Sequence, residues 1–423
     1  MNIFYIVPYV PNLIRVRPFN FIRELSARGH HVKVFTVWKD EEEYGNVQKL
    51  NNICEEVNAV RVTPQRSLLN VAYAFPTSQP LQYVYSWSDE LANKIQEDLS
   101  WVDVVHVEHL RGARYGISVR DGRAESLPPI VWDSVDSISY LFKQASNVSR
   151  TRFGSLITRF DLKRTRCYEA ELVHRFDRVI VTSKVDREEL IRLAKDADGH
   201  RLGGELGLGV SHLERNTLDQ EHIHVLPNGV DLDYFTPADN LRDPDMLVFS
   251  GKMSYHANAT AALFLVEQLM PRIWCERPQV QLSIVGKDPP KQIRILQEID
   301  PRVIVTGTVP DIRPYLQNAS VALLPIVYGA GCQNKVLEAM ACGTPVVTMP
   351  QAISALKVQE GEEIFVGREP DELAHLVLDL LGDPNLRSRI GEAGRLFVEK
   401  NHRWTDITAK LEEIYCEVRD VKH

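Results

Sequence analysis

The sequence predicts two α/β domains, each built as a doubly wound parallel sheet covered by helices. The 423 residues exceed what a single hydrophobic core usually holds. Short runs of β-branched and aromatic residues alternate with longer helical patterns. A polar, proline-bearing stretch at residues 236–245 interrupts this alternation, which then starts again. We therefore place an N-terminal domain at residues 1–236 and a second domain at residues 237–403.

The first domain is predicted from apolar runs separated by helical patterns. Its expected strands are residues 3–7, 31–37, 59–63, 102–107, 129–132, 178–182 and 223–226. Its expected helices include residues 18–28, 88–99 and 184–193. Strands that alternate with helices in this way are typical of parallel sheets, whose ligands bind where the strands end.

The second domain repeats the pattern. Its expected strands are residues 247–250, 280–285, 303–306, 321–324, 345–348 and 363–366, and its expected helices include residues 259–274, 333–341 and 371–381. The tail, residues 395–421, carries apolar residues at helical spacing. This stripe must be buried, but its periodicity alone does not say on which domain.

Composition and charge exclude several classes of protein. A formal charge of -8 and a pI near 5.9 argue against a general nucleic-acid-binding role. The six cysteines form no C-x-x-C pair, which indicates reduced thiols. The apolar start of the chain lacks a basic leader and runs into prolines, so it predicts a first strand instead of a signal peptide. No apolar run reaches the roughly 20 residues of a membrane span. We expect a cytoplasmic protein without a nucleic-acid partner.

The most informative segment is a glycine loop between a strand and a helix, at residues 328–347. The glycines let a ligand approach the backbone, and the N–H groups of the new helix favour a diphosphate. Lys335 adds a positive charge in this helix. Glu338, three residues further on, could accept two hydrogen bonds from a ribose diol. On spacing alone, an ordinary tight turn fits this segment as well as a phosphate site does.

The same segment resembles the donor-binding signature of glycosyltransferase family 4, whose members are retaining enzymes with the GT-B fold. Glu338 matches the second of two glutamates in that signature, and residues 339–347 match the Ala-Met-Ala and Gly-x-Pro-Val-Val parts. Ala330 stands where most members have the first glutamate. The local form resembles a branch linked to bacterial exopolysaccharide gene sets, in which this glutamate is also typically missing. We therefore do not interpret Ala330 as a sign of inactivity.

The resemblance also implies further donor contacts and a domain hinge. The segment 226–235 is similar to the family's hinge, and a terminal helix from Trp404, at about residues 404–423, is expected to return to the first domain. Lys252 stands at the position of a family arginine and Ala257 at that of a family lysine, so the diphosphate charge is assigned jointly to Lys252 and Lys335. The implied donor-binding residues are Gly251, Gly286, Val309, Gly331, Cys332, Asn334, Leu337 and Glu338.

Candidate residues in the first domain are fewer. His109, at the end of a strand, resembles a histidine that family members place near the reacting sugar, whereas His106 is interpreted as a strand residue. Arg15 and Arg17 could meet an anionic acceptor or the donor phosphates, and Asp136 is a weaker acceptor candidate. Basic residues gather between positions 143 and 166. They suggest either peripheral contact with an anionic membrane or a solvated helix face.

The predicted function is transfer of a sugar from a nucleoside diphosphate sugar to a hydroxyl of a saccharide or lipid-linked acceptor, with retention of configuration. No cofactor beyond this co-substrate is expected. The resemblance implies that no metal is needed either, and the Asp-Leu-Asp segment 231–233, which lies in the hinge-like sequence, is interpreted as a turn with solvated acids. Two alternatives remain. One is a sugar-nucleotide epimerase of the same fold, and the other is a non-catalytic partner that binds nucleotide sugars.

Overall fold

The computed structural model describes residues 1–122, 127–148, 152–201, 221–238, 241–327 and 333–422. The chain divides into two compact units. Unit 1 comprises Met1–Pro227 and Trp404–His423, and unit 2 comprises Asn228–Arg403. The division therefore falls earlier than the predicted boundary after residue 236. The hinge segment packs with unit 2 because the N–H of Val230 donates to the carbonyl oxygen of His402 at 2.8 Å.

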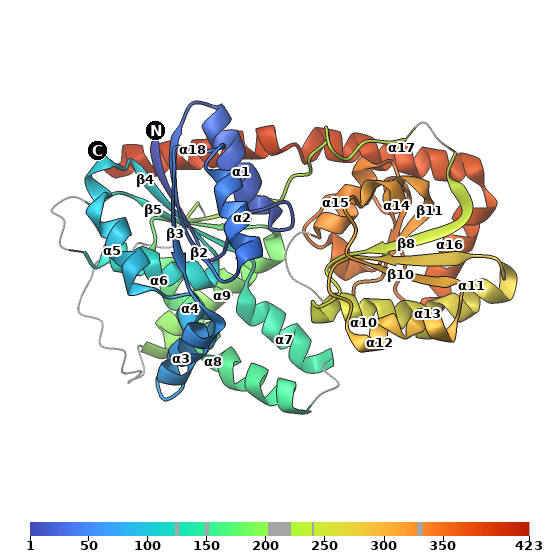
Figure 1. The fold of residues 1–423 in the computed structure, drawn as a ribbon, viewed down its shortest axis with the longest axis horizontal. Coiled ribbons are helices and arrows are strands. Elements are labelled where there is room, and N and C mark those ends of the chain that lie inside the picture. The colour runs from blue at the N-terminus through green and yellow to red at the C-terminus, as the bar shows by residue number, and fades with distance from the viewer. Residues whose placement is uncertain (123–126, 149–151, 202–220, 239–240, 328–332, 423) are drawn as a thin grey trace. The chain divides into compact units, whose positions relative to one another are not determined.

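Unit 1 contains a seven-stranded sheet in the order β3-β2-β1-β4-β5-β6-β7, and every pairing in it is parallel (Figure 1). The strands are β1 (Asn2–Val7), β2 (His31–Trp38), β3 (Glu56–Arg61), β4 (Val104–Glu108), β5 (Ile130–Val135), β6 (Arg178–Val181) and β7 (Ile223–Val225). The central strands are buried on both faces, which explains their nearly continuous apolar sequences.

Helices cover both faces of this sheet. They are α1 (Val16–Ala27), α2 (Glu41–Leu50), α3 (Pro64–Ala74), α4 (Leu81–Tyr85), α5 (Asp89–Glu97), α6 (His109–Arg120), α7 (Ile138–Val148), α8 (Arg152–Arg175), α9 (Lys184–Arg201) and the terminal α18 (Trp404–Lys422), with a 3-10 turn at Leu99–Trp101. The apolar stripe of α18 packs against α1 and β1 in one cluster with Phe21 and Tyr5. The terminal helix thus belongs to unit 1, as the family resemblance implied.

Unit 2 contains a six-stranded, wholly parallel sheet in the order β10-β9-β8-β11-β12-β13 (Figure 1). The strands are β8 (Asp243–Ser250), β9 (Gln281–Val285), β10 (Val303–Gly307), β11 (Ala319–Leu324), β12 (Val346–Thr348) and β13 (Phe365–Val366). The helices are α10 (His256–Phe264), α11 (Met270–Glu276), α12 (Lys291–Arg294), α13 (Leu296–Ile299), α14 (Arg313–Asn318), α15 (Asn334–Ala341), α16 (Pro370–Gly382) and α17 (Pro384–Asn401), with a 3-10 turn at Pro350–Ile353. The two parallel sheets confirm the predicted fold class.

One expected helix is not uniform. The sequence predicts a single α-helix over residues 259–274, but α10 and α11 are joined by a π-helical turn at Leu265–Leu269. Pro271 lies two residues after the end of this turn. Because proline has no N–H and its ring crowds the carbonyl four residues earlier, the regular hydrogen-bond pattern cannot continue through it.

Each sheet has one point at which the strand order reverses. In unit 1 this point lies between β1 and β4, and in unit 2 it lies between β8 and β11. Loops at the carboxyl ends of two such strands leave in opposite directions, so a crevice opens between them and binds ligands in doubly wound folds. We therefore expect functional side chains at these two edges.

Candidate functional site

The edge of unit 2 begins with a close contact between two glycines. Gly286, after β9, has a φ of 150°, and a Cβ at this position would lie 1.8 Å from the carbonyl oxygen of Gly251. Gly251, after β8, has a φ of 148°, and its N–H donates to the carbonyl oxygen of Val285 at 3.0 Å. Only glycine fits both positions. Bare backbone therefore forms this part of the edge, and the two loops lie closer together than side chains at these positions would allow.

Lys335, in the first turn of α15, is held over this backbone. Its ammonium group donates to Oδ1 of Asn258 and lies 5.4 Å from the centroid of the Phe249 ring. The Nδ2 atom of Asn258 donates in turn to the carbonyl oxygen of Lys252 at 2.9 Å. A Cβ at Gly251 would lie 3.2 Å from the Lys335 ammonium. The lysine charge is thus fixed beside the glycine contact.

Asn258 is a site residue that the sequence reasoning missed. It lies in the first turn of α10 and is buried. The only sequence signal was indirect, because the expected family lysine is replaced by Ala257 and the next residue is a polar Asn258. In this chain the asparagine does not supply a charge. It positions the charge that Lys335 supplies.

Lys335 and Glu338 form a pair whose pKa values lie close to neutral pH. Burial lowers the pKa of Lys335 to about 8, although the charge of Glu338 acts in the opposite direction. Burial likewise raises the pKa of Glu338 to about 7, opposed by Lys335. A ligand with a negative charge near Lys335 would favour its protonated form. Both side chains can therefore respond to a ligand at neutral pH.

The other predicted donor residues have varied surroundings. Asn334 accepts a hydrogen bond from Nδ2 of Asn228 at 2.8 Å. Leu337 is fully buried in the core, so only its backbone remains for a ligand contact, and Val309 packs partly buried against the same core. Gly331 and Cys332 lie outside the described residues.

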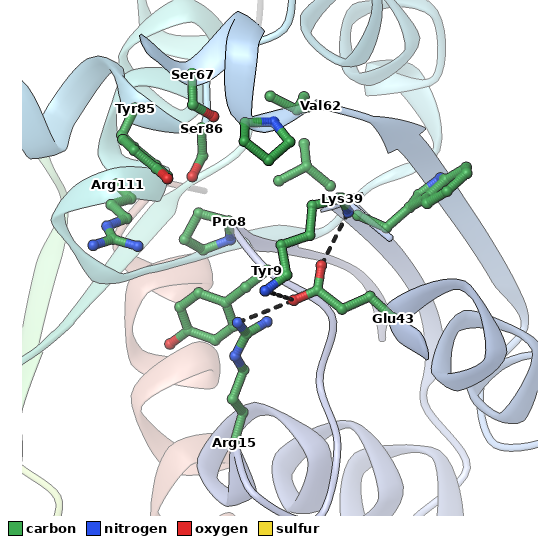
Figure 2. Close-up of a pocket in the computed structure, with 13 residues that line it drawn as sticks. Pro8, Tyr9, Arg15, Lys39, Glu43, Val62, Ser67, Tyr85, Ser86 and Arg111 are labelled. Carbon is green, nitrogen blue, oxygen red and sulfur yellow. Dashed lines mark hydrogen bonds and ion pairs between the residues drawn. The ribbon is translucent and has the colours of Figure 1, made fainter. Parts of the chain in front are cut away.

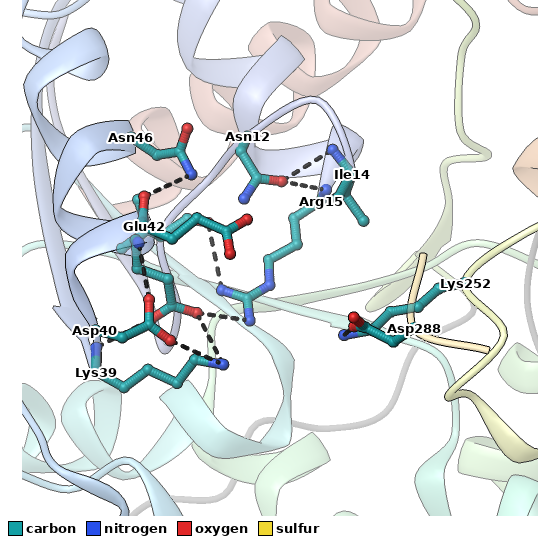
Figure 3. A network of polar contacts seen from close by, with 11 residues as sticks. Asn12, Ile14, Arg15, Lys39, Asp40, Glu42, Asn46, Lys252 and Asp288 are labelled. Carbon is teal, nitrogen blue, oxygen red and sulfur yellow. Dashed lines mark hydrogen bonds and ion pairs between the residues drawn. The ribbon is translucent and has the colours of Figure 1, made fainter. Parts of the chain in front are cut away.

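Lys252 is the most exposed of the predicted cations. About half of its side chain is open to solvent, and its ammonium lies 4.0 Å from Oδ2 of Asp288, as Figure 3 shows. A solvated pair at this distance contributes little to stability. Lys252 can therefore exchange this partner for a ligand at small cost.

The edge of unit 1 carries His109 in an unusual backbone conformation. His109 begins α6 directly after β4 and has a φ of 65°, which costs a residue with a Cβ about 1–2 kcal/mol. Its Nδ1 accepts a hydrogen bond from the N–H of Arg111 at 3.2 Å. The proton of the neutral ring is therefore assigned to Nε2. Burial lowers the pKa of His109 to about 3, so the ring stays neutral and can donate from Nε2.

A pocket of about 150 Å³ opens beside the β1 end of this edge (Figure 2). Two of its cations share one acid, since Arg15 lies 3.2 Å and Lys39 lies 3.8 Å from Oε1 of Glu43 (Figure 2). Arg111 adds a third cation and lies over the ring of Tyr85 at 5.0 Å. The lining residues are Pro8, Tyr9, Arg15, Val37, Trp38, Lys39, Glu43, Val62, Pro64, Ser67, Tyr85, Ser86 and Arg111. Three cations facing one acid favour a ligand with negative charge.

A buried carboxyl group lies behind Tyr9. The hydroxyls of Tyr5 and Tyr9 donate to the two oxygens of Glu108 at 3.0 and 2.5 Å. Burial raises the pKa of Glu108 to about 8, with a further contribution from the charge of Asp133. Glu108 thus holds the wall of the pocket in place. The sequence analysis did not single it out.

Arg17 has partners inside unit 1. Its side chain is only 4% exposed, and its Nε donates to Oδ2 of Asp133 at 2.7 Å. Its Nη1 donates to the carbonyl oxygens of Leu226 at 3.1 Å and of Pro227 at 3.4 Å. Through these contacts Arg17 stabilises unit 1, which the sequence did not predict. Its contact with an acceptor stays a prediction. Arg15, by contrast, lines the pocket.

The same buried group reaches the terminal helix. His106 is fully buried in β4, as the sequence predicted for a strand residue, and its Nε2 lies 3.8 Å from Oδ2 of Asp133. Its Nδ1 is hydrogen-bonded to the hydroxyl of Tyr415 in α18 at 2.8 Å. Burial lowers the pKa of His106 well below its usual range. The imidazole is therefore neutral and links α18 to the sheet.

Asp136 lies after β5. Its Oδ1 accepts a hydrogen bond from the hydroxyl of Thr182 at 3.0 Å. Burial raises the pKa of Asp136 to about 7, and the nearby charge of Asp186 adds to this shift. Asp136 is thus already engaged within unit 1, and its contact with an acceptor stays a prediction.

The structure also describes the two acids of the segment 231–233 and part of the basic segment between positions 143 and 166. In the hinge, Oδ1 of Asp231 accepts from the N–H of Tyr234 at 3.0 Å, while Asp233 is exposed. No cluster of three or more His, Cys, Asp or Glu residues suited to a metal occurs in the described part of the chain. Within the basic segment, Arg164 donates to the carbonyl oxygen of Phe75 at 2.8 Å. Arg150 lies outside the described residues.

Sequence comparisons relate the chain to glycosyltransferases. Residues 244–383 match the family described as Glycosyl transferases group 1. A GDP-mannose-dependent monoacylated alpha-(1-6)-phosphatidylinositol monomannoside mannosyltransferase of Corynebacterium glutamicum is 28% identical over 212 residues, which cover 45% of this chain and 55% of that relative. A D-inositol 3-phosphate glycosyltransferase of Frankia alni is 26% identical over 200 residues, which cover 42% of this chain and 49% of the relative. The chain thus spans about half the length of these curated relatives.

Solved structures match over the whole chain. Sucrose-phosphate synthase from Thermosynechococcus elongatus has a TM-score of 0.67 at 17% identity and covers 99% of both chains. HepE of Anabaena, in complex with UDP and glucose, has a TM-score of 0.66 at 15% identity, covering 99% of this chain and 100% of its own. WaaG, a glycosyltransferase involved in lipopolysaccharide biosynthesis, has a TM-score of 0.60 at 14% identity, with 98% and 99% covered. These similarities confirm the GT-B fold.

Proposed function

We propose that this chain is a glycosyltransferase that takes its sugar from a nucleoside diphosphate sugar. The match of residues 244–383 to the group 1 glycosyl transferases supports the class of reaction. The relatives named above are glycosyltransferases, and one solved neighbour holds UDP and glucose. The chain's own residues supply the rest of the argument.

The observation that carries the proposal is the fixed ammonium of Lys335 beside bare backbone at Gly251 and Gly286. A diphosphate needs close backbone approach and a positive charge that does not move away. We assign the ribose diol to Glu338, which lies one turn further along α15 and whose carboxylate can accept two hydrogen bonds. This combination suits the nucleoside diphosphate part of a donor better than it suits a free sugar.

The chemical demand of the reaction is stabilisation of the departing diphosphate. As the bond between the sugar and the diphosphate breaks, negative charge grows on the diphosphate and positive charge on the sugar ring. We assign the first task to Lys335, helped by Lys252 and the N–H groups at the start of α15. We assign to His109 a neutral hydrogen-bond donor role toward the sugar.

The finer parts of the proposal come from the sequence. We infer retention of configuration, and no metal or other cofactor is part of the proposal. The acceptor would be a saccharide or lipid-linked hydroxyl compound in exopolysaccharide or glycolipid assembly. The relative from Corynebacterium glutamicum, named for a phosphatidylinositol mannoside, supports a lipid-linked acceptor. A cytoplasmic location accords with the unpaired cysteines among the described residues, which are Cys54, Cys167, Cys275, Cys342 and Cys416.

The proposal is tested with the purified chain and a panel of nucleoside diphosphates and their sugars. A ligand that binds the folded state raises the melting temperature in proportion to the logarithm of its concentration over Kd. We expect one nucleoside diphosphate to stabilise the protein, and its sugar derivative to be hydrolysed slowly without acceptor. A non-catalytic partner would bind without releasing sugar, and an epimerase would instead convert the sugar within the nucleotide. If no member of the panel binds, the proposal fails.

A further inference from the structure

Helix α3 shows the reverse of the usual polarity of a surface helix. Leu68, Leu69 and Tyr73 are 65%, 51% and 76% exposed. Their spacing places them on one face of the helix. The inner face instead carries Ser67 and Asn70, both buried, and Nδ2 of Asn70 donates to the carbonyl oxygen of Trp87 at 3.0 Å. An outward apolar face on a monomeric protein usually marks an interaction surface.

Two phenylalanines extend this apolar face beyond the helix. Phe75, just after α3, is 57% exposed, and Phe160 of α8 is 41% exposed. Their rings stack with centroids 4.9 Å apart and planes inclined by 23°. We call the resulting surface the α3 patch, which consists of Leu68, Leu69, Tyr73, Phe75 and Phe160. Aromatic side chains of this kind are favoured at the boundary between lipid and water.

The segment of α8 that begins at Phe160 presents mostly positive charge. The guanidinium of Arg164 lies 4.1 Å over the ring of Phe160, and Lys163 and Arg166 on the same helix are exposed. Asp161 is only 3% exposed, and it accepts a hydrogen bond from the N–H of Leu81. This local charge contrasts with the formal charge of -8 of the whole chain. Basic side chains beside an apolar aromatic face complement an anionic lipid surface.

We propose that the α3 patch docks this protein onto a bilayer that contains anionic phospholipid. The apolar residues would insert at the level of the headgroups, while Lys163 and Arg166 meet the lipid phosphates. Helix α3 also contributes Pro64 and Ser67 to the pocket of unit 1. If the proposed function holds, docking brings that pocket next to a lipid-linked acceptor. The docking itself does not depend on catalysis.

The test measures co-sedimentation of the full chain with vesicles of phosphatidylcholine, with and without phosphatidylglycerol. We expect binding to the anionic vesicles to exceed binding to the neutral ones at least tenfold, and to weaken with added salt. The variant Leu69→Asp/Tyr73→Asp should lose at least tenfold in vesicle binding. A matched control is Ile299→Asp/Leu396→Asp, since these unit 2 residues are 70% and 64% exposed. This control should bind within twofold of the unaltered chain.

Several different results would overturn the proposed docking of the α3 patch. Failure of the unaltered chain to bind anionic vesicles, or equal loss in both double variants, would overturn the proposal. So would a dimer in sedimentation that Leu69→Asp/Tyr73→Asp dissolves, because a second copy would then cover the patch. An unchanged melting temperature identifies variants that fold normally. Slow donor hydrolysis, measured without vesicles, tests the proposed function separately, since the altered residues do not line the pocket.

Discussion

The two units share one plan but build their ligand-binding edges from different material. In unit 2 the edge consists of bare backbone at Gly251 and Gly286, with one lysine fixed over it by Asn258. In unit 1 the edge consists of side chains, with the ion pair of Arg17 and Asp133 buried behind it. A backbone edge depends on the identity of a few glycines. A side-chain edge depends on partners that are distant in sequence.

This difference leads to opposite expectations for mutations. In unit 1, residues 17 and 133 are far apart in the chain, yet their charges must match because both side chains are buried. In unit 2, a single added methyl group at a glycine should disturb the edge.

Arg17→Met should destabilise unit 1 by about 3–5 kcal/mol, because it leaves Asp133 buried without its cation. Burial already raises the pKa of Asp133, and the Arg17 charge opposes that shift. Urea unfolding followed by tryptophan fluorescence measures the effect, because five of the six tryptophans, Trp132 among them, belong to unit 1.

Two controls accompany this measurement. Arg23→Met removes a partly exposed pair with Glu24 and should change the free energy of unfolding by less than about 1 kcal/mol. Adding Asp133→Asn to Arg17→Met should recover part of the lost stability. If Arg17→Met lowers the free energy of unfolding no more than Arg23→Met does, the buried ion pair does not stabilise unit 1. The predicted contact of Arg17 with an acceptor would then be the better explanation of this residue.

Gly286→Ala should destabilise unit 2 by about 2–4 kcal/mol and weaken nucleotide binding. The added Cβ would lie 1.8 Å from the carbonyl oxygen of Gly251, and the φ of 150° is strained for alanine. Trp274 is the one tryptophan of unit 2 in the sequence, so it reports the unfolding of unit 2 in a chain whose other tryptophans are replaced by phenylalanine. Gly382→Ala is the matched control, because a Cβ there meets no atom within 4 Å. Equal free energies of unfolding for the two variants would mean that the backbone at Gly251 and Gly286 can shift to admit the added methyl group.

The difference between the two edges also explains which parts of the fold and of the candidate site could be predicted from the sequence. The alternation of strands and helices predicted both parallel sheets, because each buried strand leaves a local apolar run. Lys335 and Glu338 could be proposed as site residues because they share a short segment with the glycines. Asn258 and Glu108 were missed, since their roles depend on contacts made in three dimensions. The contact from Tyr5 to Glu108 spans 103 residues, and no local pattern reveals such a pair.

Lys335→Met should reduce the rate of donor hydrolysis by about 100-fold, which is typical for loss of one fixed group that stabilises transition-state charge. Because the removed ammonium is buried beside Asn258 and the ring of Phe249, the melting temperature of the variant is measured together with the rate. Lys357→Met alters an exposed lysine of the same unit and should have no effect. A rate within threefold of the unaltered chain would remove Lys335 from the proposed mechanism.

The smallest expected effect is a bell-shaped dependence of donor affinity on pH, with its maximum between the pKa of Glu338, about 7, and that of Lys335, about 8. Above pH 8 Lys335 loses the proton that attracts the diphosphate, so affinity should fall about tenfold by pH 9. Below pH 7 Glu338 gains a proton and loses its acceptor role toward the ribose. Titration calorimetry at several pH values measures both limbs. Lys335→Arg should remove only the alkaline limb and Glu338→Gln only the acidic one.

Stability should respond to Lys335 in the opposite direction to affinity. Its folded pKa lies below the usual 10.5, so between about pH 8 and 10.5 the unfolded chain binds more protons than the folded chain does. The contribution of this group to the free energy of unfolding should therefore rise with pH across that window, just where donor affinity falls. The pH dependence of unfolding in Lys335→Met, subtracted from that of the unaltered chain, isolates this term. If the difference is flat while affinity still falls, another group of unit 2 governs the alkaline limb. A lysine fixed by one asparagine over bare backbone would then not be enough to hold the donor.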